Sequence, residues 1–141
     1  MIATTISLGA IAQQLGDYSR AITLYRNALH MIDESGDRGN EAIALANLGM
    51  TMHFLGDNEE GLLYLKRAEV VAHRRVQRDV EAFVFTAEGH AYFALGQLPE
   101  AEDCFGKALQ LRLALQQKQQ AMEPLAGLAE VALERGEVTA S

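Results

Sequence analysis

The side chains in this sequence that are most able to take part in chemistry are those of two histidines, His53 and His90, and of a single cysteine, Cys104. Imidazole can ligate a metal or transfer a proton near neutral pH, and a thiol can act as a nucleophile or a metal ligand. The two histidines have no cysteine or aspartate near them on the same predicted helix face, so they form an incomplete metal set. Cys104 lies beside Phe105 on an apolar segment and is typical of a small buried hydrophobic residue. We therefore predict no metal site and no cofactor.

Motifs for catalysis are missing from the sequence as well. It contains no Gly-rich phosphate loop, no His-Glu-x-x-His sequence and no carboxylate pair with an obvious pocket. We therefore predict that the chain is not an enzyme. A milder role stays open for His53 and His90, because partial protonation at about pH 6.5 would make binding pH-sensitive.

The charge balance narrows the class of partner. Among 141 residues, 19 acidic and 12 basic side chains give a net charge of −7. An acidic chain repels phosphate backbones, so nucleic acid is an unlikely partner. The basic concentration within residues 66–81 also contains acidic residues and is typical of a solvated helix face. The uncharged stretch 1–16 lacks a basic start and is too polar and short to span a bilayer, so we expect no membrane contact and a cytoplasmic location.

The elements that position these residues come from an internal repeat. Gly16, Gly56, Gly96 and Gly136 follow one another at intervals of forty residues. The same interval relates further small residues, namely Gly9, Gly49 and Gly89; Ala21, Gly61 and Ala101; and Ala28, Ala68 and Ala108. Apolar residues make up 49% of the chain and there are only 2 prolines, so the composition is helical. We therefore predict a tandem array of helix pairs.

Each unit of the array is expected to contain two helices with apolar residues at a period of about 3.6. The predicted helices span about 3–15, 18–35, 39–55, 58–76, 78–95, 98–117 and 121–135. Glycine ends each first helix, because it adopts the left-handed conformation readily. Asp17 is predicted to cap a second helix, Asp57 and Glu60 to form a capping box, and Pro99 to lie in a first turn. The small residues mark close helix approaches, so a larger side chain at Gly49 would separate the two helices.

These small and aromatic residues resemble the tetratricopeptide repeat. The third unit is most similar to the family pattern, with Glu88 in place of the usual leucine, and its matching residues are Gly89, Tyr92, Gly96, Ala101, Phe105 and Ala108. The forty-residue period exceeds the family's usual period of about thirty-four, and the closing proline is missing. Long-period arrays of this kind resemble those in bacterial multidomain regulators and in scaffold proteins that hold extended peptides.

The resemblance implies an all-α fold, a right-handed superhelical solenoid of antiparallel helix hairpins. We expect a single domain over residues 1–141, with three repeats at about 2–41, 42–81 and 82–121. Residues 122–141 are expected to form a capping helix or a truncated fourth repeat. Both a complete array and a piece of a longer one fit this pattern.

In this family the first helix of each repeat lines the concave face. Helical geometry then places eight residues of the second and third units there, namely Asn47, Met50, His53, Phe54, Phe83, Thr86, His90 and Phe93. This face has no full charge over the first three units, which suits an extended peptide or a partner helix. The lysines and the asparagine of the family's clamp for a peptide carboxyl terminus are missing, so we reject that mode of binding.

The role of these residues has two readings at this point. Asn47 and His90 could make polar contacts with a peptide, or Asn47 could be a surface amide or join two helices. The three phenylalanines could bind a partner or pack between repeats. We predict a non-catalytic protein–protein interaction module within a larger regulatory or scaffold protein. The alternative is a structural array that assembles as a homodimer through its exposed ends.

Overall fold

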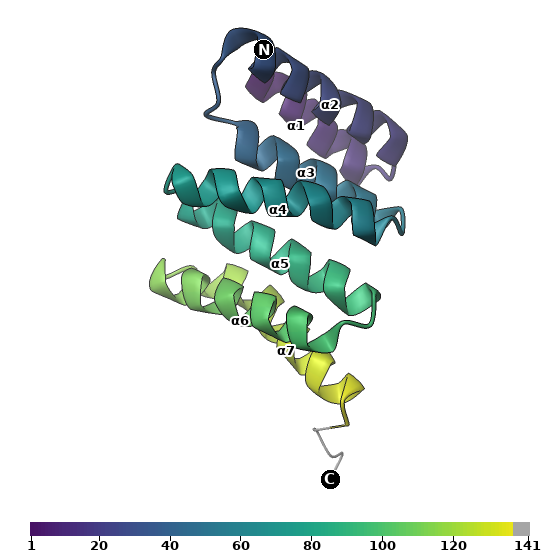
Figure 1. Cartoon of the computed structure of the whole chain (residues 1–141), viewed down its shortest axis with the longest axis vertical. Coiled ribbons are helices and arrows are strands. Elements are labelled where there is room, and N and C mark those ends of the chain that lie inside the picture. The colour runs from purple at the N-terminus through teal and green to yellow at the C-terminus, as the bar shows by residue number, and fades with distance from the viewer. Residues whose placement is uncertain (137–141) are drawn as a thin grey trace. The chain divides into compact units, whose positions relative to one another are not determined.

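A computed structural model of the chain describes residues 1–136, and these form seven α-helices and no strand, which confirms the all-α prediction. The helices are α1 (Ile2–Gln14), α2 (Tyr18–Ser35), α3 (Glu41–Phe54), α4 (Asn58–Arg74), α5 (Arg78–Ala94), α6 (Leu98–Ala114) and α7 (Lys118–Glu134) (Figure 1). Every approximate predicted bound lies within three residues of the observed one. α4 and α6 stop before Val76 and Gln116, because these two residues adopt positive φ angles of 55° and 59° that a helix cannot accommodate.

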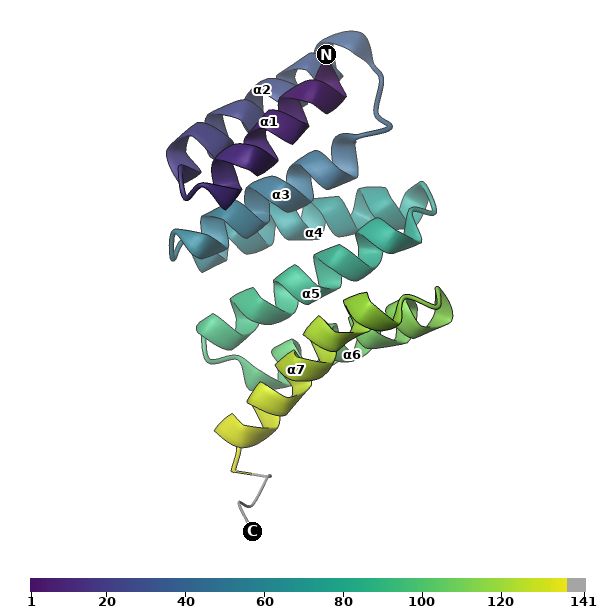
Figure 2. The same cartoon turned by 180° about the vertical axis from the view of Figure 1, so that it is seen from behind.

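The described helices group into two compact units, one over Met1–Val76 and one that begins at Gln77. In unit 1, α1 pairs with α2, α3 pairs with α4, and α2 packs on α3. In unit 2, α5 pairs with α6, and α6 packs on α7. Figure 2 shows α1 and α3 on one side of unit 1, and α5 and α7 on one side of unit 2. We call this the first-helix face of each unit.

Small residues allow the paired helices to approach closely, as the sequence predicts. A Cβ atom at Gly49 would lie 2.7 Å from Leu65 Cγ and 2.8 Å from the carbonyl oxygen of Gly61. A Cβ atom at Gly89 would lie 2.6 Å from the ring of Phe105. Contacts this short cannot exist between real atoms, so a larger side chain at either glycine must push the helices apart.

Short turns after each first helix hold glycines in the left-handed region. Gly16, Gly56, Gly96 and Gly136 have φ angles between +72° and +84°. The cap of α2 is confirmed, since the backbone N–H of Arg20 donates to Asp17 Oδ1 over 3.3 Å.

The predicted capping box of α4 is wrong. Asp57 occupies the N-cap position, but its side chain accepts no hydrogen bond from the first turn. The first turn of α4 carries Glu59 and Glu60, whereas that of α2 has no acidic residue. Repulsion between neighbouring carboxylates opposes their convergence on the same N–H groups. Pro99 does lie in the first turn of α6, and Cys104 is buried, both as predicted.

Within residues 1–136, no helix combines the length and the apolar character needed to cross a membrane.

Candidate functional site

The first-helix face of unit 1 contains an accessible amide at Asn47. Asn47 is half-buried on α3, and its side chain forms no hydrogen bond within residues 1–136. Its backbone carbonyl oxygen, by contrast, accepts a hydrogen bond from the Thr51 hydroxyl over 2.8 Å. The interpretation of Asn47 as a helix–helix hydrogen bond is therefore not supported among the described residues. The amide keeps both a donor and an acceptor for another molecule.

A polar network beside Asn47 joins α1, α2 and α3. The Tyr25 hydroxyl donates to Gln13 Oε1 over 3.0 Å, and the Thr51 hydroxyl lies 2.9 Å from the same oxygen. The Tyr25 side chain is fully buried, and this burial raises its pKa to about 12. Gln13 thus serves the packing of unit 1, because its oxygen satisfies two side chains at a junction of three helices.

An aromatic cluster lies at the C-terminal end of α3. Phe54 stacks on Tyr18 with ring centroids 5.7 Å apart, and the His53 ring is 5.6 Å from the Phe54 ring. His53 Nδ1 is hydrogen-bonded to Asn58 Oδ1 over 2.5 Å. About half of the Phe54 side chain stays exposed. Tyr18 and Asn58 were not predicted as site residues, because they begin second helices, which the family resemblance places on the opposite face.

In unit 2, His90 on α5 contacts the last helix. His90 Nε2 lies 2.9 Å from Glu123 Oε2, and the His90 ring meets Phe105 edge-on at 5.1 Å between centroids. The hydrogen bond with His90 lowers the pKa of Glu123, burial opposes this shift, and the charges of His90 and Arg112 add to it. The His90 and Glu123 side chains stay partly exposed, so the pair faces solvent.

Two of the eight predicted face residues are buried. Met50 has 7% of its surface exposed, and Thr86 has 4% exposed with its hydroxyl donating to the Ala82 carbonyl oxygen over 3.0 Å. Neither side chain offers a surface for a partner in this structure. Phe83 is half-buried, and Phe93 packs partly against the cluster of Ala101, Phe105 and Val131. The four candidates of α3 lie together in unit 1, and those of α5 lie together in unit 2.

The residues described by the structure contain no group of three or more histidine, cysteine, aspartate or glutamate side chains placed to hold a metal ion.

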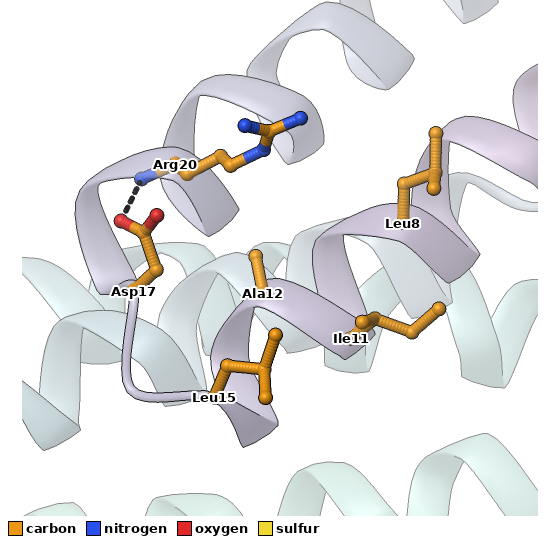
Figure 3. Close-up of a pocket in the computed structure, with 6 residues that line it drawn as sticks. All are labelled: Leu8, Ile11, Ala12, Leu15, Asp17 and Arg20. Carbon is orange, nitrogen blue, oxygen red and sulfur yellow. Dashed lines mark hydrogen bonds between the residues drawn. The ribbon is translucent and has the colours of Figure 1, made fainter.

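A shallow cavity of about 250 Å³ lies elsewhere on unit 1, between α1 and the start of α2 (Figure 3). Leu8, Ile11 and Ala12 of α1 line it, together with Leu15 just after the helix, and Asp17 and Arg20 form its polar side. The sequence does not single out this cavity, because the apolar residues of α1 follow the pattern of a core-facing helix.

Comparison with known proteins places the fold. The profile described as Tetratricopeptide repeat matches residues 1–69, and a second profile of the same description matches residues 82–115. No curated protein sequence matches the chain.

Three solved structures illustrate the likeness. PcrH from Pseudomonas aeruginosa superposes with a TM-score of 0.75 and 21% identity over 93% of this chain and 91% of its own. The Sgt2 TPR domain from Aspergillus fumigatus superposes with a TM-score of 0.72 and 19% identity over 99% of this chain and 85% of its own. A MamA RS-1 double mutant superposes with a TM-score of 0.60 and 20% identity over 98% of this chain and 78% of its own.

At these identities the structures establish the fold, an array of helical hairpins with a C-terminal helix. The two profile matches together span more than half of the sequence. The chain therefore belongs to the tetratricopeptide repeat family, whose members are protein–protein interaction modules.

Proposed function

We propose that the chain is a non-catalytic module of a cytoplasmic regulatory or scaffold protein, and that it binds a peptide segment of a partner on its first-helix faces. We assign these faces to the concave face by the family resemblance, in which first helices line it. The observation that carries the proposal is the Asn47 amide, half-buried on α3 and without an internal hydrogen bond among the described residues. A polar group in that position gains stability when a ligand supplies its partner. An amide can pair with both polar groups of an extended peptide backbone.

Apolar area for the peptide would come from Phe54 beside Asn47, since about half of its ring is exposed. On α5, Phe83 lies about two turns before His90 and Phe93 about one turn after it, and both are half-buried. Aromatic side chains provide large contact area at low entropic cost, which suits them to protein interfaces.

Charge adds a preference at the end of unit 2. Glu123 accepts a hydrogen bond from His90 and stays ionised over a wider pH range because its pKa is lowered. Glu130 and Glu134 follow on the same helix and are partly or fully exposed. Complementary charge favours a partner with lysine or arginine at this end.

The test is fluorescence anisotropy of a labelled peptide library in positional pools, measured with the wild type and with Asn47→Ala, His90→Ala and the double variant. Loss of one hydrogen bond should weaken binding by about 3- to 10-fold for each single variant. Asn27→Ala is the matched control for the amide, because Asn27 is exposed on α2. His30→Ala is the matched control for the imidazole, because His30 is exposed on α2.

Equal affinity of all variants, with unchanged helical content by circular dichroism, would refute the assignment of these residues. Absence of binding from every pool would refute the peptide-binding function itself. Sedimentation velocity on the same samples decides the alternative reading, because a homodimeric structural array predicts a dimer without any peptide.

A further inference from the structure

The side-chain amide of Gln13 on α1 is only half used by the packing of unit 1. Its oxygen, Oε1, lies 3.0 Å from the Tyr25 hydroxyl and 2.9 Å from the Thr51 hydroxyl, and both of these side chains are fully buried. The oxygen therefore points into the junction of α1, α2 and α3. Because an amide carries its oxygen and its nitrogen on opposite sides of one carbon atom, the nitrogen, Nε2, points away from this junction.

The outward-facing nitrogen of Gln13 is open to solvent. Nε2 makes no hydrogen bond among residues 1–136, and it is not one of the buried side-chain atoms there that lack a partner. Gln13 itself is half-buried, so its amide is held in place by its surroundings. Two N–H donors with a fixed direction thus remain for another molecule.

The equivalent junction of unit 2 shows that the fold does not require an amide at this position. Two intervals of forty residues later, the three members of the polar network have apolar equivalents, namely Phe93, Phe105 and Val131. Phe105 and Val131 belong to one core cluster, and Phe93 packs against it. Unit 2 therefore joins α5, α6 and α7 with apolar side chains at all three positions. The polar junction of unit 1 supplies donors that packing alone does not need.

Asn47 carries the second accessible amide of unit 1, and it lies close to the first. The Thr51 hydroxyl is 2.8 Å from the backbone carbonyl oxygen of Asn47 and 2.9 Å from Gln13 Oε1. Asn47 and Thr51 are four residues apart on α3, so they lie on the same side of the helix. The hydrogen bond at Thr51 therefore anchors the Gln13 amide one turn, or about 6 Å along α3, from Asn47.

The spacing and the chemistry of the two amides fit an extended backbone. The carbonyl and N–H groups on one edge of an extended strand recur at every second residue, about 6.6 Å apart. One strand edge can therefore meet Gln13 with a carbonyl oxygen and Asn47 with both polar groups of the second residue along. A helical peptide does not offer this edge, because its interior carbonyl groups accept hydrogen bonds within the helix.

We infer that unit 1 binds a partner segment in an extended conformation, with Gln13 Nε2 donating to a backbone carbonyl oxygen and the Asn47 amide pairing with the backbone two residues away. The inference rests on the peptide-binding function proposed above. It adds Gln13 as a binding residue and decides between an extended and a helical ligand, which the sequence leaves open.

The probes are fluorescein-labelled peptides of about twelve residues in positional pools, prepared in two forms. Both forms contain an acidic residue and a lysine at i and i+4. In one form these are left free, and in the other a lactam bridge between them holds the peptide helical. Peptides of this length form at best marginal helices in water, so the linear form is free to extend. Circular dichroism verifies the helical content of both forms before titration.

We expect the linear pools to bind the full chain saturably in fluorescence anisotropy, and the bridged pools to bind at least about tenfold more weakly. Gln13→Glu should weaken binding of the linear pools at least about tenfold. This exchange keeps an oxygen for Tyr25 and Thr51, but it replaces both N–H donors with an acceptor that repels a carbonyl oxygen. Gln13→Met, which removes the amide without adding charge, should weaken binding about 3- to 10-fold.

Gln14→Glu is the matched control for charge. It makes the same exchange at the next residue of α1, which is exposed, and it should leave the affinity unchanged. Urea denaturation of each variant verifies that the protein is folded under the conditions of the titration.

Two results would overturn the inference and leave the peptide-binding function in place. The first is binding of the linear pools that Gln13→Glu and Gln14→Glu affect equally. The second is binding of the bridged pools that is as tight as that of the linear pools. Absence of binding in both forms is a different outcome, because it would refute the peptide-binding function and the inference together.

Discussion

Val76 offers a sharp test of how this array ends its second helices. Val76 lies two residues after the last residue of α4 and has a φ angle of 55°, and its N–H donates to the His73 carbonyl oxygen over 3.2 Å. Forty residues earlier the same position holds Gly36, with a φ angle of 75°. A left-handed conformation costs an L-residue about 1–2 kcal/mol, and a β-branched side chain is among the least suited to it. Val76 therefore carries backbone strain that asparagine would relieve.

The net change in the free energy of unfolding follows from two opposing contributions. Val76→Asn should recover about 1–1.5 kcal/mol of the left-handed cost, because asparagine visits this region readily. The Val76 side chain is 68% exposed, so its replacement loses about 0.5 kcal/mol of apolar burial. We expect stabilisation of about 0.5–1 kcal/mol. Val76→Gly should gain less, because glycine adds about 0.5–1 kcal/mol of backbone entropy to the unfolded chain.

The assay is urea denaturation followed by circular dichroism, with the midpoint rising at an unchanged slope. Val70→Asn is the control, since it makes the same exchange at an exposed position inside α4, where the two residues have similar helix propensity. Gly36→Ala is the reciprocal change, and no atom lies within 4 Å of its added Cβ, so its expected loss of about 1 kcal/mol reports the backbone alone. A midpoint for Val76→Asn at or below that of Val70→Asn would refute the strain argument.

Three further predictions concern packing and pH. Gly49→Ala should destabilise the chain by about 1–3 kcal/mol in urea titrations, whereas Gly106→Ala in α6 should stabilise it by up to about 1 kcal/mol, because only the first added Cβ meets other atoms within 4 Å. Tyr25→Phe should cost about 1 kcal/mol at pH 7. It should also remove a loss of stability between pH 10 and about 12, since the unfolded tyrosine ionises first and the folded pKa is raised to about 12. Glu123→Gln should flatten the acid limb of the stability profile, because the lowered folded pKa of this carboxyl gives stability above its usual value of 4.5 that is lost as the pH falls below it.

The helix pattern could be predicted from the sequence because it rests on local chemistry. The forty-residue interval of Gly16 and its equivalents identifies the turns, and each of these glycines has a positive φ angle. The ends of α4 and α6 were placed two or three residues too late, because no glycine marks them in the sequence. Val76 and Gln116 take the left-handed conformation without being residues that favour it.

The candidate site was harder to predict, because accessibility depends on contacts between helices. Helical periodicity places Met50 and Thr86 on the same side as Asn47 and His90, but it cannot show that both are buried. It also cannot show that His90 bonds to Glu123, thirty-three residues away. The position of a residue in the helical repeat shows on which side of the helix its side chain lies. Packing between helices decides whether that side chain is accessible to a partner.

A repeat array provides its own internal control for this question. A position that is buried in every first helix serves the fold, so its residue type says little about a partner. A position that is exposed in one repeat and buried in the others identifies a difference in surroundings, because the sequence pattern is shared. Leu8 and Ile11 meet this criterion, since Leu128 and Val131 pack against α6 while their equivalents on α1 stay open to solvent. The apolar character of Leu8 and Ile11 therefore follows from the stacking pattern of the repeat, so it is explained by the fold without reference to a partner.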